Sequence, residues 1–332
     1  MALSAILPIQ DSAPNLLQAS STDVDEHCAA LGRWRLSYDQ ISAGAFRGSF
    51  TQLSLPRLEV FREITSQQVR QYGQLGADSF GIGLPWDVRW DGDGELSCNG
   101  TSARGARVLA SIDAEIDMCT PKAFELRGVV ASTVLIAELA ARLDIELPRA
   151  VWHQLRVIET AEAPVARLRA HLAAIHETIA TTPERFDDPL ARQALEDALL
   201  VEIMDMLPTA RPSDPGRSSQ ARKRTVDRAR ELMHGSGERA LSLLEVCKAV
   251  GASPRKLGYC FQEVVGTSPM HYWRAMRLNR VRRDLKRGGA ATSIYDVAVQ
   301  HGFWHFSQFS LDYKRHFSEL PSETLRRARL AA

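Results

Sequence analysis

The sequence predicts an α+β protein in which a β-rich N-terminal region with a helical hairpin precedes an all-helical C-terminal region. Three observations lead to this prediction: an alternation of polar and apolar residues, an apolar seam of helical spacing, and an internal repeat of helical character. The 332 residues are 45% hydrophobic and 24% charged, which is ordinary globular composition and argues against a disordered or fibrous chain. A chain of this length favours two or more domains with sizeable cores.

Strand patterns fill the first region, at about residues 40–130. Polar and apolar residues alternate strictly over residues 111–118, which is the period of a half-buried strand. Further strands are predicted at residues 58–65 and 79–84, with a turn at 91–94.

A helical pattern begins after Ser132 and continues to about residue 207. Apolar residues recur there at spacings of 3, 4, 3 and 4, in a seam made of Val165, Leu168, Leu172, Ile175 and Ile179. Two heptads are too few for a stable isolated coiled coil. The seam therefore indicates either a helical hairpin with a second helix near residues 187–207 or a contact between two copies of the chain.

A segment rich in proline, glycine and serine separates the two regions. Residues 208–220 contain three prolines, one glycine and three serines, so we expect a linker without a helix at residues 208–222. The charge changes sign at the same place. Residues 217–332 contain 22 Lys/Arg and 10 Asp/Glu, a net charge of +12, whereas residues 1–216 have a net charge of −11. Such asymmetry indicates that the basic half binds a polyanion.

An internal repeat follows the linker. Ser242-Leu-Leu-Glu-Val-Cys247 matches Ser293-Ile-Tyr-Asp-Val-Ala298 at an offset of 51, and Gly251 matches Gly302 at the same offset. One residue is then inserted in the second copy. The positions that match at an offset of 52 are Leu257 with Phe309, Phe261 with Tyr313, Val265 with Phe317, and Pro269 with Pro321.

Each copy has the pattern of a helix, a glycine turn and a second helix. Ser242 and Ser293 are predicted helix caps with an acidic residue three positions later, and Ser253 is a predicted cap for the second helix of the first copy. Gly251 and Gly302 stand where a tight turn favours positive φ. A generic helical hairpin is the alternative for one copy. Two copies in a strongly basic region favour helix-turn-helix units whose second helices enter the major groove.

A long helix is predicted between the copies, from Pro269 to Arg287. Its nineteen residues span roughly 28 Å, close to the ~34 Å between successive major-groove faces of one duplex. One chain can therefore place the second helices of its two units in adjacent major grooves. Arg274, Arg277 and Arg280 form a basic stripe on this helix that suits either a solvated surface or contact with phosphate.

The C-terminal region resembles the AraC/XylS family of transcription regulators over about residues 225–329. The motifs that carry the resemblance are Gly266-Thr-Ser-Pro269, Arg277-Leu-Asn-Arg-Val-Arg-Arg-Asp-Leu285, Val297-Ala-Val-Gln-His-Gly-Phe-Trp-His-Phe-Ser-Gln-Phe-Ser310, Tyr313-Lys-Arg-His-Phe317 and Leu320-Pro321-Ser322. The resemblance implies a double helix-turn-helix DNA-binding domain at residues 223–332. It also implies activation of transcription, with double-stranded DNA and RNA polymerase as partners. The apolar seam from Val165 to Ile179 favours in addition a homodimer formed by the acidic half.

The acidic half resembles the β-rich sensor domains of ethanolamine-utilisation-type regulators in that family. This resemblance implies a cupin-like sensor and dimerisation domain at residues 1–207 and a small-molecule effector. The residues themselves identify neither the effector nor its contacts, because Phe61, Trp86 and Trp90 suit a core as well as a pocket. They also leave the target operator unidentified.

The outward positions of the two second helices are the candidate DNA-binding residues. In the first helix they are Arg255, Lys256, Tyr259 and Gln262. Arginine pairs with guanine through two hydrogen bonds, and lysine reaches guanine or phosphate. The alternative for this face is a solvated helix surface.

The second reading face is less polar. Its candidates are His305, Ser307, Gln308, Ser310 and Leu311. Glutamine suits adenine, and leucine suits the methyl group of thymine. We expect His305 to contact phosphate or cap the helix, and we expect Phe306 to be part of the core.

Chemistry for catalysis or metal binding is weak in this sequence. Asp113, Glu115 and Asp117 share one strand face in the alternating pattern, and a solvent-facing strand is favoured over a cation site because no histidine is near. The histidines of the acidic half form no HxH pattern, and the five cysteines form no CxxC pair. We therefore predict no catalytic site, no metal site and no cofactor.

Two other function classes stay open at this point. One is an enzyme fused to a DNA-binding tail that uses Cys98 or Cys119, although neither has a base beside it in the sequence. The other is a constitutive DNA-architectural protein, against which Arg255 and Gln308 favour base reading. No basic n-region opens the sequence, and the apolar run at residues 128–137 is shorter than the ~18 residues of a spanning helix. We therefore expect a soluble cytoplasmic protein.

Overall fold

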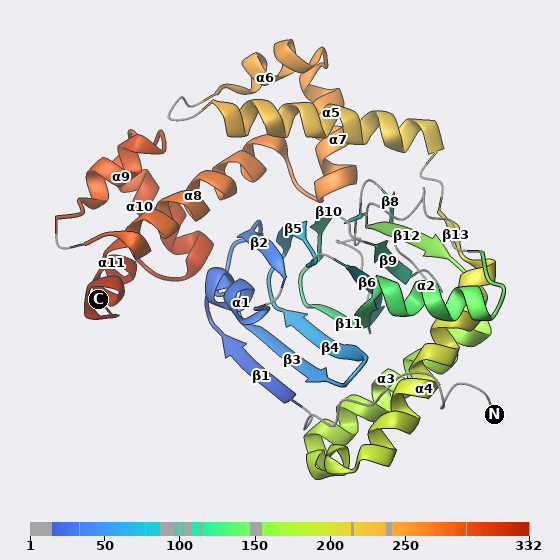
Figure 1. The fold of residues 1–332 in the computed structure, drawn as a ribbon. Helices are drawn as coiled ribbons and strands as arrows, with labels where there is room; N and C mark the ends of the chain where they lie inside the picture. Colours follow the sequence, from blue (N-terminus) through green and yellow to red (C-terminus); the bar gives the residue numbers. More distant parts are fainter. Residues whose placement is uncertain are drawn as a thin grey trace.

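The computed structural model shows two parts that pack against each other, a β-rich N-terminal part (residues 15–213) and a helical C-terminal part (residues 216–331) (Figure 1). The structure describes residues 15–32, 34–76, 78–86, 97–98, 101–102, 108–112, 115–146, 155–213, 216–236, 241–289 and 291–331. The predicted turn at residues 91–94, together with Trp90 and Asp113, lies outside these residues. The predicted α+β class is confirmed.

Two antiparallel sheets form the N-terminal part. Among the described residues the larger sheet has the strand order β1-β3-β4-β11-β6-β9-β12-β13 and the smaller sheet the order β2-β5-β10-β7-β8. The strands of the larger sheet are β1 (Asn15–Ser21), β3 (Gly48–Ser54), β4 (Leu58–Thr65), β11 (Phe124–Ser132), β6 (Ser79–Trp86), β9 (Val108–Ile112), β12 (Arg156–Glu159) and β13 (Arg211–Pro212). Those of the smaller sheet are β2 (Arg35–Gln40), β5 (Val69–Gln74), β10 (Glu115–Cys119), β7 (Ser97–Cys98) and β8 (Thr101–Ser102).

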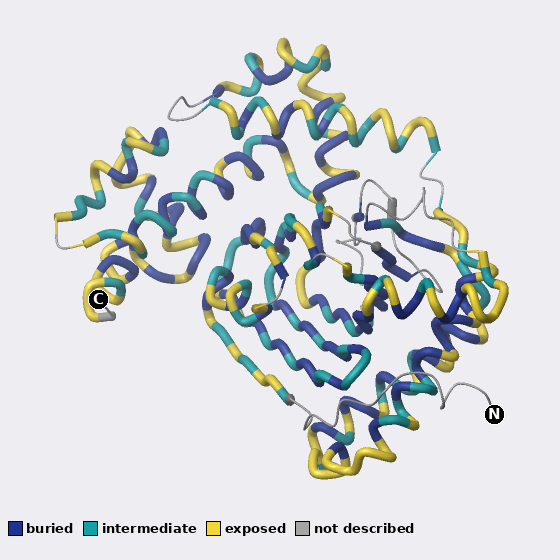
Figure 2. The backbone as a smooth tube through the Cα atoms, viewed as in Figure 1, coloured by how far each residue is buried: buried dark blue, intermediate teal, exposed yellow. Residues whose placement is uncertain are grey.

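The central strands of the larger sheet are buried on both faces because their side chains alternate between two cores. Phe61 of β4 and Val130 of β11 face the smaller sheet. Their neighbours Val60 and Val129 face a helical layer instead. Such alternation is the period-2 geometry of a strand, and here both faces are apolar because both are covered. Figure 2 shows the resulting buried backbone through the centre of the N-terminal part.

The helical layer consists of α2 (Thr133–Arg142), α3 (Glu162–Thr181) and α4 (Pro189–Met206), with short 3₁₀ turns at Pro183–Asp187 and Leu207–Thr209. The five seam residues predicted from the spacing all lie on α3 and are buried in the core shared with α4 and the larger sheet. The structure thus shows the helical hairpin. The alternative, that this seam is a contact between two copies, is wrong because one chain already covers it.

Three expectations for the N-terminal part need correction. Strands and a helix, α1 (Val24–Ala30), precede residue 40, and β12 interrupts the region expected to be helical. The alternating pattern at residues 111–118 is divided between β9 and β10, which belong to different sheets. Alternation records which face a residue takes, and it continues unchanged where a chain passes from one sheet to the next.

Seven helices of the described residues build the C-terminal part. They are α5 (Gly216–Gly235), α6 (Leu243–Val250), α7 (Pro254–Val265), α8 (Pro269–Arg287), α9 (Ile294–Gln300), α10 (Phe306–Phe317) and α11 (Pro321–Ala331). The long helix α8 begins and ends where the sequence predicted. The first unit packs on its N-terminal half through Tyr272, Trp273 and Met276. The second unit packs on its C-terminal half through Leu278, Val281 and Leu285.

The expectation that residues 208–222 contain no helix is wrong for their C-terminal half. Helix α5 begins at Gly216, and its Val226, Ala229 and Met233 are buried in the core of the first unit. All three prolines of the segment precede this helix, so they do not interrupt it. The division of the chain into a sensor and dimerisation domain and a DNA-binding domain stays a prediction. None of the helices in the described ranges is long and apolar enough to cross a membrane.

Candidate nucleic-acid interface

The two copies of the repeat fold into two helix-turn-helix units, α6–α7 and α9–α10. In the first unit Ser242 and Glu245 form a reciprocal capping box at the start of α6, and Ser253 caps α7 by accepting a hydrogen bond from the Lys256 amide at 3.2 Å. In the second, the Asp296 amide donates to the hydroxyl of Ser293 at the start of α9. The turns contain Gly251 (φ 66°) and Gly302 (φ 75°), in the left-handed region that favours glycine.

The inward positions of the two second helices are buried as predicted. Leu257, Phe261 and Val265 of α7 belong to the core of the first unit, and Phe309, Tyr313 and Phe317 of α10 belong to the core of the second. Because these positions recur every fourth residue, they fix the opposite face of each helix toward solvent.

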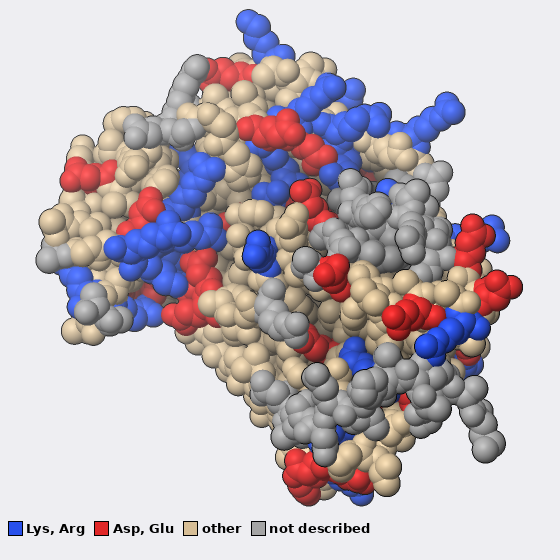
Figure 3. Space-filling view, viewed as in Figure 1, with Lys and Arg blue, Asp and Glu red and all other residues tan. Residues whose placement is uncertain are grey.

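The outward face of α7 carries a cationic N-terminal turn. Arg255 and Lys256 are exposed, and among the described residues their side chains have no hydrogen-bond or ion-pair partner. Tyr259, one turn later, is 55% exposed, and the Arg222 guanidinium lies 5.8 Å from its ring centre. Gln262 is also exposed. Figure 3 shows Lys and Arg side chains gathered over the C-terminal part, at the top and left of the molecule.

The outward face of α10 is neutral and partly engaged. Leu311 is 62% exposed and Ser307 is exposed, whereas Ser310 is half-buried. Gln308 donates a hydrogen bond to Asp312 at 2.9 Å, so its amide is already held before any DNA arrives. This unit therefore offers small polar and apolar groups rather than positive charge.

Two expectations at the start of α10 differ from the structure. Phe306 is 40% exposed and stacks between Tyr295 and Phe309, so it is not a core residue. It is the first residue of α10, where a side chain lies at the edge of the helix pair. His305 occupies the N-cap position but makes no side-chain capping bond. Of the two expectations for His305, capping is therefore wrong, and a contact between its exposed ring and phosphate stays a prediction.

The arginine stripe on α8 serves mainly to hold the helices together. The Arg277 side chain donates to the carbonyl of Gly302 at 3.1 Å and lies over the Phe303 ring, and burial together with Arg274 lowers its pKa to about 10. Arg280 contacts His234 at 2.8 Å. Arg274 is half exposed and pairs with Asp312 at 3.5 Å. Of the three, Arg274 is therefore the one best placed for phosphate.

The acidic strand residues have another role than the sequence suggested. Glu115 is exposed, but Asp117 forms ion pairs with Arg70 at 2.9 Å and Arg230 of α5 at 2.8 Å. The expectation of a solvent-facing Asp117 is wrong because α5 covers this end of the smaller sheet. Its pKa is raised, since burial outweighs the neighbouring Arg70. In the described ranges, no three His, Cys, Asp or Glu side chains come together as a metal site.

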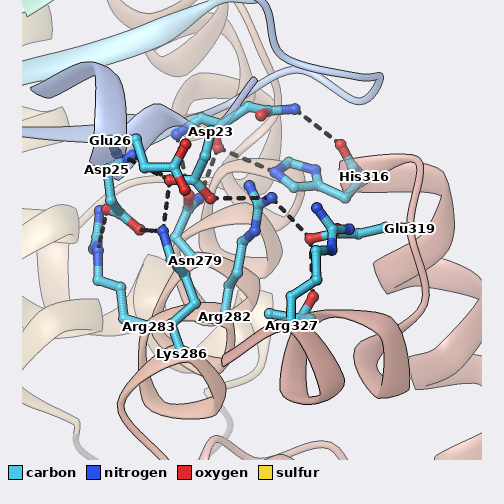
Figure 4. Close-up of polar contacts among 12 residues, drawn as sticks. Asp23, Asp25, Glu26, Asn279, Arg282, Arg283, Lys286, His316, Glu319 and Arg327 are labelled. Carbon is cyan, nitrogen blue, oxygen red and sulfur yellow. Dashed lines mark hydrogen bonds and ion pairs between the residues drawn. The ribbon is translucent and has the colours of Figure 1, made fainter. Parts of the chain in front are cut away.

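Sequence patterns did not indicate the polar contacts between the two parts, which Figure 4 shows around α8. Arg282 bridges Asp23 of α1 at 3.1 Å and Glu319 of the α10–α11 turn at 2.8 Å. Arg283 pairs with Asp25 and Asp39, both at 2.8 Å. Burial alone would raise the pKa of Asp23, but Arg282 and Lys286 lower it below its usual value.

A second set of contacts joins the loops that follow β2 and β4 to the C-terminal part. The Gln40 backbone and the buried Asn279 side chain of α8 exchange two hydrogen bonds, at 3.2 Å and 2.8 Å. The carbonyl of His316 in α10 accepts from the Gly44 amide at 3.0 Å. The carbonyl of Val265 in α7 accepts from the Gln68 side chain at 2.6 Å. No periodic pattern could have signalled these residues, because loop contacts depend on tertiary structure.

Comparison with known proteins gives matches to this C-terminal region. The helix-turn-helix domain family matches residues 246–327. The chain is 32% identical over 107 residues to the XylDLEGF operon transcriptional activator 1 of Pseudomonas putida, a segment that spans 32% of each protein. The chain thus covers about a third of the length of that relative.

Two solved structures are also similar. One is a probable AraC family transcriptional regulator from Rhodopseudomonas palustris, with 31% identity, 32% of this chain and 98% of that chain covered, and a TM-score of 0.30. The other is the AraC-like transcriptional activator CuxR, with 12% identity, 79% and 94% coverage, and a TM-score of 0.42.

Proposed function

Because residues 246–327 form a helix-turn-helix domain of the AraC/XylS type, we propose that the whole chain is an effector-responsive transcription activator that reads two adjacent major-groove segments. One observation carries this proposal: the outward faces of α7 and α10, in two units joined by the nineteen-residue α8, are both open to solvent. Arg255 and Lys256 supply base and phosphate contacts at the first groove. Ser307, Gln308 and Leu311 supply them at the second.

A cavity between the two sheets supports the effector. It has a volume of about 50 Å³ and is lined by aromatic and aliphatic side chains, among them Trp34, Tyr38 and Phe61. Glu63, Gln71 and Ser111 are buried polar residues of its lining, and Glu63 pairs with His27 at 3.0 Å. Its composition, apolar with a few converging polar groups, is that of a small-molecule site, but its volume is below the ~300–1,000 Å³ typical of such sites. We therefore propose that an effector binds between the sheets by widening this cavity; Trp86 does not line it.

The remaining partners follow from this role. An activator acts through RNA polymerase, on duplex DNA in the cytoplasm. A homodimer would raise affinity by effective concentration when two copies bind neighbouring sites. Since the α3 seam is buried within one chain, the dimer contact must use other residues, and exposed apolar side chains of α4 such as Leu190 and Val201 are available.

The alternative functions find less support. Burial raises the pKa of the Cys98 thiol, and it raises that of Cys119 to about 12. Neither side chain can therefore supply the thiolate that a cysteine-dependent enzyme needs. A constitutive architectural protein would need no Arg255 or Gln308 aimed at base edges, and it would need no cavity in its N-terminal part.

Selection of random duplexes by the full chain tests the proposal. We expect enrichment of a bipartite site whose two halves lie about one helical turn, ~10 base pairs, apart. A reporter gene behind that site then measures transcription with and without small metabolites that raise the melting temperature of the protein. Duplexes enriched without any shared sequence would favour the architectural protein. Reporter transcription that never responds to such metabolites would refute the role of the N-terminal part as a sensor.

A further inference from the structure

The N-terminal part contacts the C-terminal ends of α7 and α10, the second helices of the two units, which are the recognition helices of the proposed function. Its docking loops are residues 40–44, which begin at the last residue of β2, and residues 66–68, which join β4 to β5. The Gln68 side chain donates to the carbonyl of Val265, the last residue of α7. Gly44 donates to the carbonyl of His316, in the last turn of α10. Carbonyls at the end of a helix have no partner within it, so the docking loops satisfy acceptors in both helices.

Apolar packing accompanies these hydrogen bonds. Ile41 has no exposed surface and belongs to the same buried cluster as Leu257, Phe261 and Trp273 of the first unit. One residue earlier, the backbone amide and carbonyl of Gln40 exchange two hydrogen bonds with the Asn279 side chain at the middle of α8. A single loop of the N-terminal part therefore contacts the first unit, the connecting helix and the second unit.

These contacts leave the reading faces free. In a helix-turn-helix unit the N-terminal residues of the recognition helix approach the base edges. Those residues, Arg255 and Lys256 in α7 and Ser307 and Gln308 in α10, are exposed. The docking loops hold the opposite ends of the same two helices. Docking is therefore compatible with DNA binding by both units.

We infer that residues 40–44 and 66–68 position the two recognition helices, with Ile41 and Gln68 as the positioning residues that set the half-site spacing this protein accepts. Helix α8 is one connection between the units, and the docked sheet is a second connection parallel to it. Two connections fix the separation and the relative rotation of the recognition helices, whereas one helix with the Gly288-Gly289 turn after it leaves them freer.

The inference rests on the proposed function and adds to it how an effector bound in the cavity can act on the recognition helices. Tyr38 of β2 and Glu63 of β4 line the cavity between the sheets. Gln40 follows Tyr38 by two residues, and the loop at residues 66–68 follows directly after β4. A ligand that moves either strand end therefore moves a docking loop, and with it one end of a recognition helix.

The test compares the full chain with the double variant Ile41→Ala, Gln68→Ala. The probe is the bipartite duplex that the wild-type chain selects from a random library, together with copies that carry two or three inserted base pairs and a copy with one half-site scrambled. Wild type should lose about tenfold in affinity on insertion, because the second half-site rotates out of reach. The double variant should bind the selected duplex several-fold more weakly and lose most of its dependence on spacing, while its affinity for the single half-site stays the same.

A matched control separates positioning from stability. Ile136 of α2 is equally buried but packs within the N-terminal core, so Ile136→Ala should lower the melting temperature and keep the spacing dependence. Gln68→Ala alone, at a half-buried site, should show an intermediate loss of spacing dependence in a fully folded protein.

Other outcomes would overturn the inference. Unchanged spacing dependence in the double variant would show that α8 alone sets the spacing, and tighter binding by that variant would show that docking is inhibitory. If the wild-type chain selects no common sequence, the proposed function fails together with the inference. A wild-type chain that selects a bipartite site while the variants keep its spacing refutes the inference alone.

Discussion

The two helix-turn-helix units share one backbone plan and differ in the chemistry that they present. The first recognition helix begins with Ser253 as a capping residue and exposes Arg255 and Lys256. The second begins with His305, which makes no capping bond, and exposes neutral residues such as Leu311. The repeat thus preserves the buried positions and varies the outward ones. We expect the first unit to provide most of the affinity for DNA through its positive charge. The second unit should add discrimination between base sequences through neutral side chains.

The cores of the two units also differ in their neighbours. The cluster around Phe261 includes Ile41 and Cys119 from the N-terminal part. The cluster around Phe309 contains only residues of α8 and the second unit, within the ranges that the structure describes. Loss of packing in the first unit should therefore loosen its contact with the N-terminal part, whereas the second unit, among the described residues, shares no buried apolar cluster with that part and should affect it less.

The largest expected effect follows from this difference. Phe261→Ala and Phe309→Ala should each cost about 3–5 kcal/mol of unfolding free energy, because both rings are fully buried. Phe261→Ala should in addition loosen domain docking and speed proteolysis near residues 208–213. Urea denaturation followed by fluorescence, with limited proteolysis beside it, measures both effects. Phe306→Ala, at a half-exposed ring of the same type, is the control and should cost much less. Equal proteolysis in both core variants would refute the difference between the two clusters.

Acid should act on the second unit through His316. Burial lowers the pKa of His316 to about 4 although Gln40 accepts its hydrogen bond, so the folded chain holds this ring neutral. The unfolded chain binds a proton below its ordinary pKa near 6.5. Stability should therefore be constant above about pH 6.5 and fall as the pH drops toward 4, by an upper limit of about 3 kcal/mol for this group.

Unfolding free energies of wild type and His316→Gln between pH 4 and 8 check this prediction. The variant should be less stable at pH 8 and should lose less on acidification than wild type. Parallel curves for the two proteins would show that other groups carry the acid sensitivity. His234 is one such group, since burial and Arg70 lower its pKa to about 4.

The sequence predicted the C-terminal part in detail because its signals are local. Caps at Ser242 and Ser253, glycines at the turns and apolar residues at every fourth position each act within one or two helical turns. The prediction of a helix-free linker at residues 208–222 failed because it extended the effect of the prolines to the residues that follow them. Prolines stop a helix only where they occur, and the burial of Val226 and Met233 stabilises α5 directly after them.

The N-terminal part and the domain contact were harder to predict because their determinants are not local. The alternation at residues 111–118 crosses from one sheet to the other without a change of period. Gln40 and Asn279 acquire their roles from each other, 239 positions apart in the sequence, and Ile41 acquires its role from the core of the distant first unit. Of the candidate site, the outward residues of α7 and α10 were predictable from periodicity alone, but the engagement of Gln308 by Asp312 was not.

Base reading should differ between the two units by a measurable amount. Arg255→Ala should weaken binding to the selected duplex by about 1–3 kcal/mol and relax the preference at one base pair. Gln308→Ala should cost less, because wild type must first release the bond from Gln308 to Asp312. Gel-shift titrations against duplexes with single substitutions measure both preferences. A larger loss for Gln308→Ala than for Arg255→Ala would reverse the proposed roles of the two units.

Helix capping gives a smaller effect of opposite sign in the two units. Ser253→Ala removes the side chain that accepts from the Lys256 amide and should cost about 1 kcal/mol of stability. His305→Ser supplies a capping hydroxyl that α10 lacks and should gain about 0.5 kcal/mol. Thermal melts of both variants and of the pair together test this asymmetry. A loss of stability in His305→Ser would mean that the exposed imidazole already has a structural role.

The smallest expected effect concerns charge on the second reading face. Leu311 is 62% exposed on the outward side of α10, one turn after Ser307 and Gln308. Leu311 corresponds to Tyr259 of the first unit, and Leu311→Lys adds a cation one turn after the neutral Ser307 and Gln308, so the helix should gain one phosphate contact. The slope of log affinity against log salt should then steepen by about 1, with a gain in affinity below about 1 kcal/mol at moderate salt. Leu244→Lys, at an exposed leucine of α6 and so on neither recognition helix, adds the same charge to the same region and should steepen the slope less. Equal steepening by the two variants would mean that net charge alone governs binding, and the second face would then have no separate role in it.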